Sequence, residues 1–196
     1  MRLIPNEELR SQAGTSGTPT ENTIEGLQSS LENVSRSDFR YWEFDIQESS
    51  DGKVFVFHDD AITVDGSLSE TTDMAFSQIH EAGLQQGISI PLFTEVCEHL
   101  RDREEPVMVE IKHLETDQAR SEVLQTISRL RKWKVMATPN RFSRSFPEET
   151  RDEWRSRFES EGVELVRVGR HRLNLFRSCK TRMGWFFAQP RWLFGL

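Results

Sequence analysis

Two acidic residues in one apolar run have the spacing of a metal-binding pair. Glu43 and Asp45 stand two apart in the strand-like run 40–47, so alternation places both carboxylates on one face and Phe44 on the other. Two anions on one face repel, and a shared hard cation would relieve that repulsion, which favours Mg²⁺ or Ca²⁺. The alternative is that both acids lie on the solvated face of a half-exposed strand.

Three further polar residues follow or end apolar runs elsewhere in the chain. Glu110 and Lys112 share one face of the run 107–112, and His58 directly follows the run 54–57. Parallel α/β folds build their sites at the carboxyl ends of strands, so we expect these residues and the acidic pair to lie in one layer. An imidazole with an ordinary pKa near ~6.5 can act there as a general acid or base. The alternative for His58 is an ordinary surface-loop histidine.

Strand-like and helix-like segments alternate along the chain and must position these residues. Asp51 and Gly52 predict a turn between two strands, and a loop is expected from His58 to Glu70. The expected strands are 40–47, 54–57, 107–112, 134–137 and 163–168, and the expected helices cover 24–34, 71–81, 93–100, the region of 123–130 and that of 154–158. This order predicts an α/β fold with a mainly parallel sheet, either open or closed into a barrel.

The bulk composition narrows the class of protein. The 196 residues carry a formal net charge of -7, which disfavours a nucleic-acid partner because phosphate tracking needs clustered Lys and Arg. No apolar run approaches the ~18 residues of a membrane span, so no transmembrane segment is expected. The start of the chain has acidic residues where a signal peptide would be apolar, which predicts a cytoplasmic protein.

Four short motifs, taken together, resemble the glycerophosphodiester phosphodiesterase family. They are Glu-Asn-Thr at 21–23, Glu-Phe-Asp at 43–45, His-Asp at 58–59 and Glu-Ile-Lys at 110–112, in the family's order. The layout is also similar to the sphingomyelinase D-type phospholipases, but the first and last motifs favour the former family.

The resemblance implies a TIM-type (β/α) barrel that hydrolyses phosphodiesters with a bound metal. It implies that Glu43, Asp45 and Glu110 hold the ion, and that Lys112 both binds the substrate and helps neutralise its phosphate during catalysis. His58 would protonate the departing alcohol, and Glu21 would order a substrate-binding loop. The implied substrate is a small glycerophosphodiester or a lysophospholipid-like molecule.

Two departures from the family pattern qualify this expectation. Where the family has His-Arg-Gly, this chain has Gln12-Ala13-Gly14, and losing a positioned acid or base typically costs a factor of ~10²–10⁴ in rate. The chain is also shorter than the roughly 250 residues typical of the barrel. We therefore predict an incomplete or divergent barrel at 1–176 and an aromatic tail at 177–196. That tail, a second copy or a partner chain would cover the open edges.

Two functions are consistent with this sequence. The first is metal-dependent hydrolysis of glycerophosphodiesters to an alcohol and glycerol phosphate, weakened because Gln12 cannot shuttle a proton. The second is a non-catalytic descendant of the family that serves as a ligand-binding or assembly module.

Overall fold

The structure is a computed structural model that describes residues 21–35, 39 and 41–167. Within these ranges nothing is described of the side chains of Asn33, Val166 and Arg167. The predictions made for residues 12–14 and for the aromatic tail at 177–196 lie outside the described residues.

A five-stranded sheet forms the centre of the fold, in the order β2-β1-β5-β6-β7. Strand β2 pairs antiparallel with β1, while β1, β5, β6 and β7 are mutually parallel. The bounds are β1 Trp42–Glu48, β2 Val54–Val56, β5 Val107–His113, β6 Trp133–Ala137 and β7 Glu164–Arg167. The predicted α/β fold with a mainly parallel sheet is confirmed, and the described residues do not close it into a barrel.

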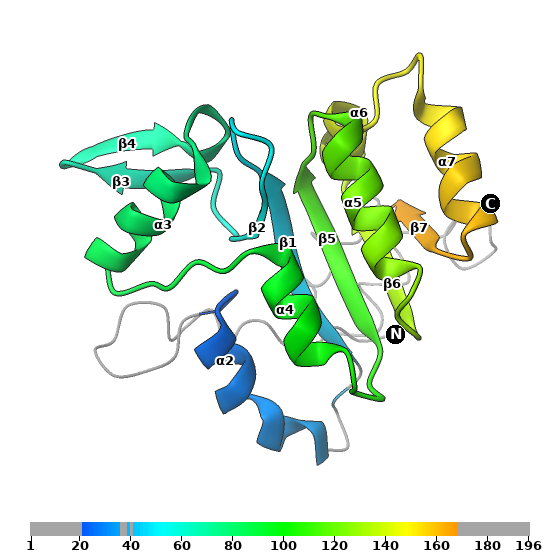
Figure 1. Cartoon of the computed structure of the whole chain (residues 1–196), viewed down its shortest axis with the longest axis horizontal. Coiled ribbons are helices and arrows are strands. Elements are labelled where there is room, and N and C mark those ends of the chain that lie inside the picture. The colour runs from blue at the N-terminus through cyan, green and yellow to red at the C-terminus, as the bar shows by residue number, and fades with distance from the viewer. Residues whose placement is uncertain (1–20, 36–38, 40, 168–196) are drawn as a thin grey trace, which may run out of the picture.

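Helices cover one face of this sheet (Figure 1). Helix α4 spans Phe93–Leu100, α5 spans Asp117–Ile127 and α7 spans Arg151–Ser160. Phe44 points to this side and meets the rings of Phe93 and Trp133, at centroid distances of 6.3 and 6.0 Å. The apolar residues of β1 and β5 therefore form the core, and the alternate residues face the opposite side.

A hairpin occupies the segment that the sequence pattern predicted to be a loop. Strands β3 (Ala61–Val64) and β4 (Ser67–Glu70) form a separate two-stranded sheet. Asp65 and Gly66 join them with φ values of 49° and 80°, which is the left-handed pair of a two-residue hairpin turn. The predicted loop is wrong, because Asp65-Gly66 between two short alternating runs forms a two-residue hairpin turn.

The next helix begins later than predicted. A 3-10 turn, η2, covers Thr71–Asp73, and helix α3 covers Phe76–Gln85. Thr71 does not cap α3, because its backbone N–H donates to the Asp60 carbonyl at 2.9 Å and so closes the base of the hairpin. The remaining elements are α2 Ile24–Ser29, η1 Leu31–Ser35 and α6 Pro139–Ser145.

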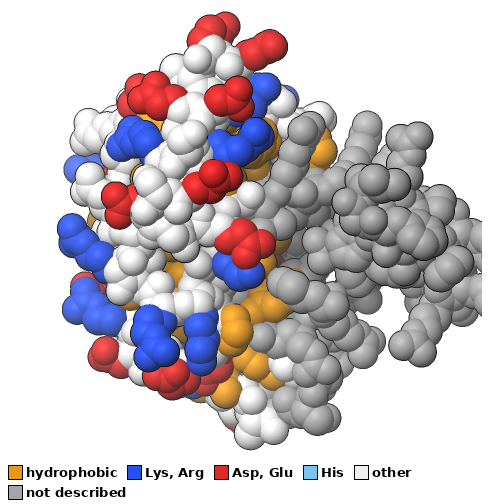
Figure 2. All heavy atoms as spheres, turned by 90° about the vertical axis from the view of Figure 1, so that its right-hand side faces the viewer, with side chains coloured by type: hydrophobic (Ala, Val, Ile, Leu, Met, Phe, Trp, Pro, Cys, Tyr) orange, Lys and Arg blue, Asp and Glu red, His pale blue; other side chains and the backbone are white. Residues whose placement is uncertain are grey.

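Charged side chains of both signs are interspersed over the described part of the face in Figure 2, and they do not gather into a single-sign patch there. Among the described residues no helix combines the length and the apolar character that a bilayer crossing requires. The cytoplasmic location stays a prediction.

Candidate metal centre and active site

Three carboxylates meet on the sheet face opposite the helices. Asp45 of β1 pairs directly with Glu110 of β5, and Glu43 lies two residues before Asp45 on the same face. Each of the three offers a carboxylate oxygen that lies within 4.8 Å of those of the other two. The structure thus brings together the three residues that the sequence predicted to be metal ligands.

The cluster lies in the middle of the sheet, which differs from the expected position. Glu43 is near the start of β1 and only Lys112 is close to the end of its strand. Strand β1 continues past the cluster because its last residues have structural partners. Glu48, for example, accepts hydrogen bonds from the backbone N–H groups of Glu115 and Thr116, at 2.6 and 2.9 Å.

Asn22 fixes the orientation of Asp45, a role that sequence reasoning did not assign. Its side-chain amide donates to Asp45 Oδ2 at 3.1 Å, and its Oδ1 accepts from the Asp45 backbone N–H at 2.9 Å. Its φ of 60° is left-handed, a conformation that asparagine adopts more readily than most residues. Thr23 then caps α2 by accepting from the Gly26 N–H at 3.0 Å. In the sequence, only the adjacent pair Asn22-Thr23 before the helix pattern could have indicated this role.

Lys112 joins two of the acids. Its Nζ lies 2.9 Å from Asp45 Oδ1 and 3.4 Å from Glu110 Oε1, and the residue is only 8% exposed. The register shifts between Ile46 and Gln47, so that Lys112 is passed over in the pairing with β1. Such irregularities often aim a side chain at a site.

The electrostatics of the cluster follow from burial and from this pairing. Burial alone would lower the pKa of the Lys112 ammonium, but the charges of Asp45 and Glu110 outweigh it and raise that pKa. Burial raises the pKa of the Glu110 carboxyl, and the charge of Asp45 adds to the rise while Lys112 opposes it. The three acids and one lysine would carry a net negative charge when all are ionised, which favours a cation beside them.

His58 lies two residues after the end of β2, next to a backbone contact with Asp45. The N–H of the preceding residue, Phe57, donates to the Asp45 carbonyl at 3.1 Å. The ring Nδ1 is 2.7 Å from Asp59 Oδ1, and a positive charge on this ring would lower the pKa of Glu110. The backbone beside His58 is therefore joined to the strand that carries Glu43 and Asp45, and the catalytic role of His58 stays a prediction.

Glu21 precedes Asn22 in the turn before α2 and is half-buried. It is adjacent in sequence to the residue that orients Asp45, but it is not one of the three clustered carboxylates. Its proposed role in ordering a substrate-binding loop stays a prediction.

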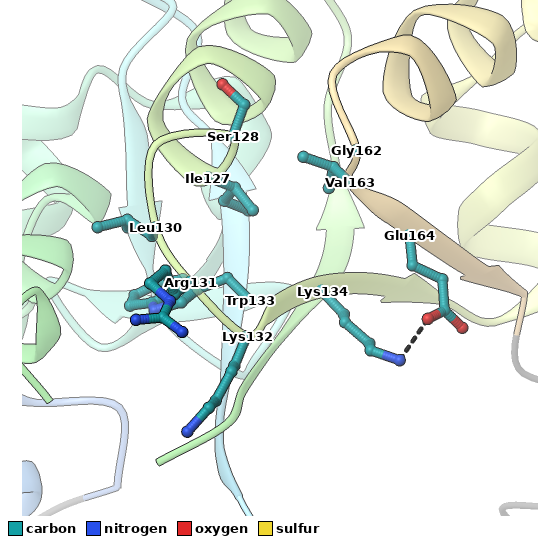
Figure 3. A pocket seen from close by; sticks show the side chains of 10 residues that line it. All are labelled: Ile127, Ser128, Leu130, Arg131, Lys132, Trp133, Lys134, Gly162, Val163 and Glu164. Atoms are coloured by element: carbon teal, nitrogen blue, oxygen red, sulfur yellow. Dashed lines mark hydrogen bonds and ion pairs between the residues drawn. The ribbon is translucent and has the colours of Figure 1, made fainter. Parts of the chain in front are cut away.

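A hollow of about 380 Å³ lies at the amino-terminal ends of β6 and β7 (Figure 3). Trp133 and Lys134 begin β6 there, and Lys134 pairs with Glu164 at the start of β7. Trp133 is paired with Val107, three residues before Glu110. This hollow is therefore separate from the carboxylate cluster, and we do not assign the substrate to it.

The chemistry of the donor set fits a hard divalent cation. Mg²⁺ and Ca²⁺ bind oxygen ligands at roughly 2.0–2.6 Å, so oxygens within 4.8 Å of one another can share one ion. Among the described residues no histidine or cysteine joins the cluster, which argues against a soft metal. The structure does not distinguish Mg²⁺ from Ca²⁺.

The fold and this cluster define an α/β protein with a mainly parallel sheet and an acidic site of the kind that holds a metal ion. The chain belongs to the glycerophosphoryl diester phosphodiesterase family, whose pattern it matches over residues 13–178. This confirms the resemblance seen in the sequence. The family has the TIM-barrel fold and is metal-dependent.

Solved structures agree on the fold. A candidate glycerophosphoryl diester phosphodiesterase from Silicibacter pomeroyi has a TM-score of 0.53 at 17% identity, over 74% of this chain and 59% of that one. The glycerophosphoryl diester phosphodiesterase domain of a Mycobacterium tuberculosis protein has a TM-score of 0.52 at 17% identity, over 86% of this chain and 62% of that one. The chain thus matches about three-fifths of the length of these relatives. No curated protein matches it significantly.

Proposed function

We propose that this protein hydrolyses glycerophosphodiesters with a bound Mg²⁺ or Ca²⁺, at a rate reduced by the loss of the family's first catalytic histidine. The observation that carries the proposal is the convergence of Glu43, Asp45 and Glu110, with carboxylate oxygens within 4.8 Å of one another and Lys112 between two of them. Family membership supports a small glycerophosphodiester as the substrate class. We extend the proposal to lysophospholipid-like molecules.

In this proposal the three carboxylates hold the ion and Lys112 neutralises the phosphate. The bound cation supplies electrostatic stabilisation of the charge that develops on phosphate oxygens. The Lys112 ammonium already lies between Asp45 and Glu110. It therefore needs no large movement to contact a substrate phosphate bound next to these two acids. Asn22 keeps Asp45 in its ligating orientation.

Protonated His58 supplies the proton that the leaving alcohol needs. Water adds to phosphorus, the bond from phosphorus to the alcohol oxygen breaks, and the proton of His58 passes to that oxygen. The products are the free alcohol and glycerol phosphate. The attacking water gives up its proton to solvent, because Gln12 stands where the family places a histidine and cannot accept it. This is the physical reason for a reduced rate.

The test is metal-dependent hydrolysis of glycerophosphocholine by the purified full chain. The natural chain is compared with the double variant Gln12→His/Ala13→Arg, and each is measured with and without Glu43→Ala. We expect the double variant to be faster by a factor of ~10²–10⁴, and Glu43→Ala to abolish turnover in both. Glu48→Gln is the matched control, since this buried carboxylate of the same strand bonds the 115–116 loop instead of the cluster.

A second candidate function rests on the same substitution. Gln12 and Ala13 in place of His-Arg fit a non-catalytic descendant that keeps the metal for binding or assembly. Metal binding with no turnover in either the natural chain or the double variant would favour this function. No metal-dependent turnover in any chain would exclude the enzyme.

A further inference from the structure

Gln47 is a buried polar residue of β1 that the proposed mechanism does not use. It is 1% exposed and lies two residues after Asp45, on the same face of the strand. Its Nε2 donates to the carbonyl of Phe57 at 2.9 Å and to the carbonyl of Asp59 at 2.8 Å. One amide group therefore binds the peptide carbonyls on both sides of His58.

The hydrogen bonds of Gln47 leave no choice for the orientation of its amide. The NH₂ group faces two carbonyl acceptors, and Oε1 accepts from the Thr71 hydroxyl at 2.8 Å. A flipped amide would set an oxygen against two carbonyl oxygens in a buried place, at the full cost of unsatisfied polar groups. Both donors of the amide are used, so the contact is rigid as well as specific.

The same contact closes the far side of the His58 loop. Thr71 donates its backbone N–H to the Asp60 carbonyl at 2.9 Å, where the β3-β4 hairpin begins and ends. Arg141 of α6 pairs with the Asp60 carboxylate at 2.7 Å from outside. Gln47 is thus the inner anchor of a short segment, 57–60, and connects that segment to the strand that carries Glu43 and Asp45.

We propose that Gln47 is a positioning residue that fixes the His58 imidazole relative to the three-carboxylate cluster. The inference rests on the proposed function, in which His58 protonates the leaving alcohol. The physical reason is that a general acid must stay within hydrogen-bond reach of the oxygen it protonates, and a displacement of about 1 Å can cost roughly 10²-fold in rate. A residue inside a strand, such as Gln47, holds a neighbouring side chain in a more precise position than a loop residue does.

The test reads the His58 ring directly and needs no turnover. The imidazole ¹⁵N shifts of His58, assigned by their loss in His58→Gln, are recorded for the natural chain and for Gln47→Met, which keeps the volume and removes all three hydrogen bonds. In the neutral ring, the Nδ1 contact with Asp59 favours one tautomer and so predicts two distinct nitrogen shifts in the natural chain. We expect them to move toward a common averaged value in Gln47→Met.

Glu48→Gln is the matched control, because Glu48 neighbours Gln47, is as deeply buried and anchors a different loop. It should lower stability without moving the His58 shifts. Thr71→Val, which removes the hydroxyl that contacts both Gln47 Oε1 and the Asp60 carbonyl, should shift them part of the way and provides a second variant if Gln47→Met does not fold. Unchanged His58 shifts in the variants that fold, or equal changes in Glu48→Gln, would overturn the proposal.

Kinetics separate this inference from the proposed function. In the Gln12→His/Ala13→Arg background, Gln47→Met should lower kcat by about 10²-fold with little change in KM, since the metal and phosphate contacts remain. If that background has no activity, the enzyme proposal fails, while the His58 shifts still report whether Gln47 positions the ring.

Discussion

At the scale of single residues, the candidate site combines charges that burial would otherwise disfavour. Asp45 is 2% exposed. Its Oδ2 accepts one hydrogen bond from Asn22, and its Oδ1 has Lys112 Nζ at 2.9 Å as a counter-ion but accepts no hydrogen bond of good geometry from the described residues. Glu110 is less well compensated, because its distance to Lys112 is longer and Asp45 lies beside it. Burial and the neighbouring charge of Asp45 therefore raise the pKa of Glu110, which makes the stability of the fold depend on pH.

Without metal, the stability difference between Glu110→Gln and the natural chain should depend on pH. The folded pKa of Glu110 is raised above its ordinary 4.5, so its contribution to stability is fully present below 4.5 and is lost as the pH rises through the folded value. Glu110→Gln should therefore gain relative stability from about pH 4.5 upward. Urea unfolding with a chelator across this range measures it, and a constant or falling difference would contradict the prediction.

At the scale of elements, local signals predicted most strands and helices within a few residues. The strand predicted at 107–112 is β5, and the Asp51-Gly52 turn joins β1 to β2 with a φ of 75° at Gly52. One error lies in the segment from 61 to 75, where Thr71 serves the hairpin and Gln47 instead of a helix cap. Another is helix α6 at Pro139–Ser145, where no element was expected. A threonine can cap a helix or close a loop, and the sequence alone does not choose.

Arg120 of α5 should be a principal link between elements in the later half of the domain. It is 4% exposed and donates to the carbonyls of Leu114 and Glu115, at 3.2 and 2.8 Å, and to that of Ser145 on α6. Arg120→Met should lower the free energy of unfolding by about 3 kcal/mol, because it leaves several buried carbonyls without donors.

The matched control for this prediction is Arg155→Met on α7. Arg155 pairs only with exposed Asp152 among the described residues, so its loss should cost at most about 0.5 kcal/mol. Urea titration of both variants gives the two values. Equal losses would show that the buried arginine does not connect these elements.

At the scale of the whole molecule, a bound ion would connect the neighbouring strands β1 and β5 at the centre of the fold. The cluster draws its ligands from β1 and β5, strands that also pair with β2 and β6. An ion that binds the folded chain and not the unfolded chain stabilises the folded state. Mg²⁺ or Ca²⁺ at about 100 times its dissociation constant should raise the free energy of unfolding by about 2.7 kcal/mol.

Thermal unfolding with each ion and with a chelator measures this stabilisation. Asp45→Asn should remove most of it, and Glu48→Gln should retain it, because Glu48 lies outside the cluster. Stabilisation of equal size in Asp45→Asn would place the ion elsewhere.

The sequence by itself determined the family, the α/β class and the three carboxylates of the candidate metal site. Alternation along a strand is a local property, so the spacing of Glu43 and Asp45 was enough to place them on one face. Their convergence with Glu110 was expected only through the motif order.

Only the tertiary structure decided the contacts between residues far apart in sequence. The pairing of Asp45 with Glu110 depends on strand register, and the contact of Asn22 with Asp45 depends on where α2 packs. The Gln47 amide reaches both carbonyls beside His58 because β1 and β2 fold back on each other. Register and packing are set by the burial of whole faces, which no short motif encodes.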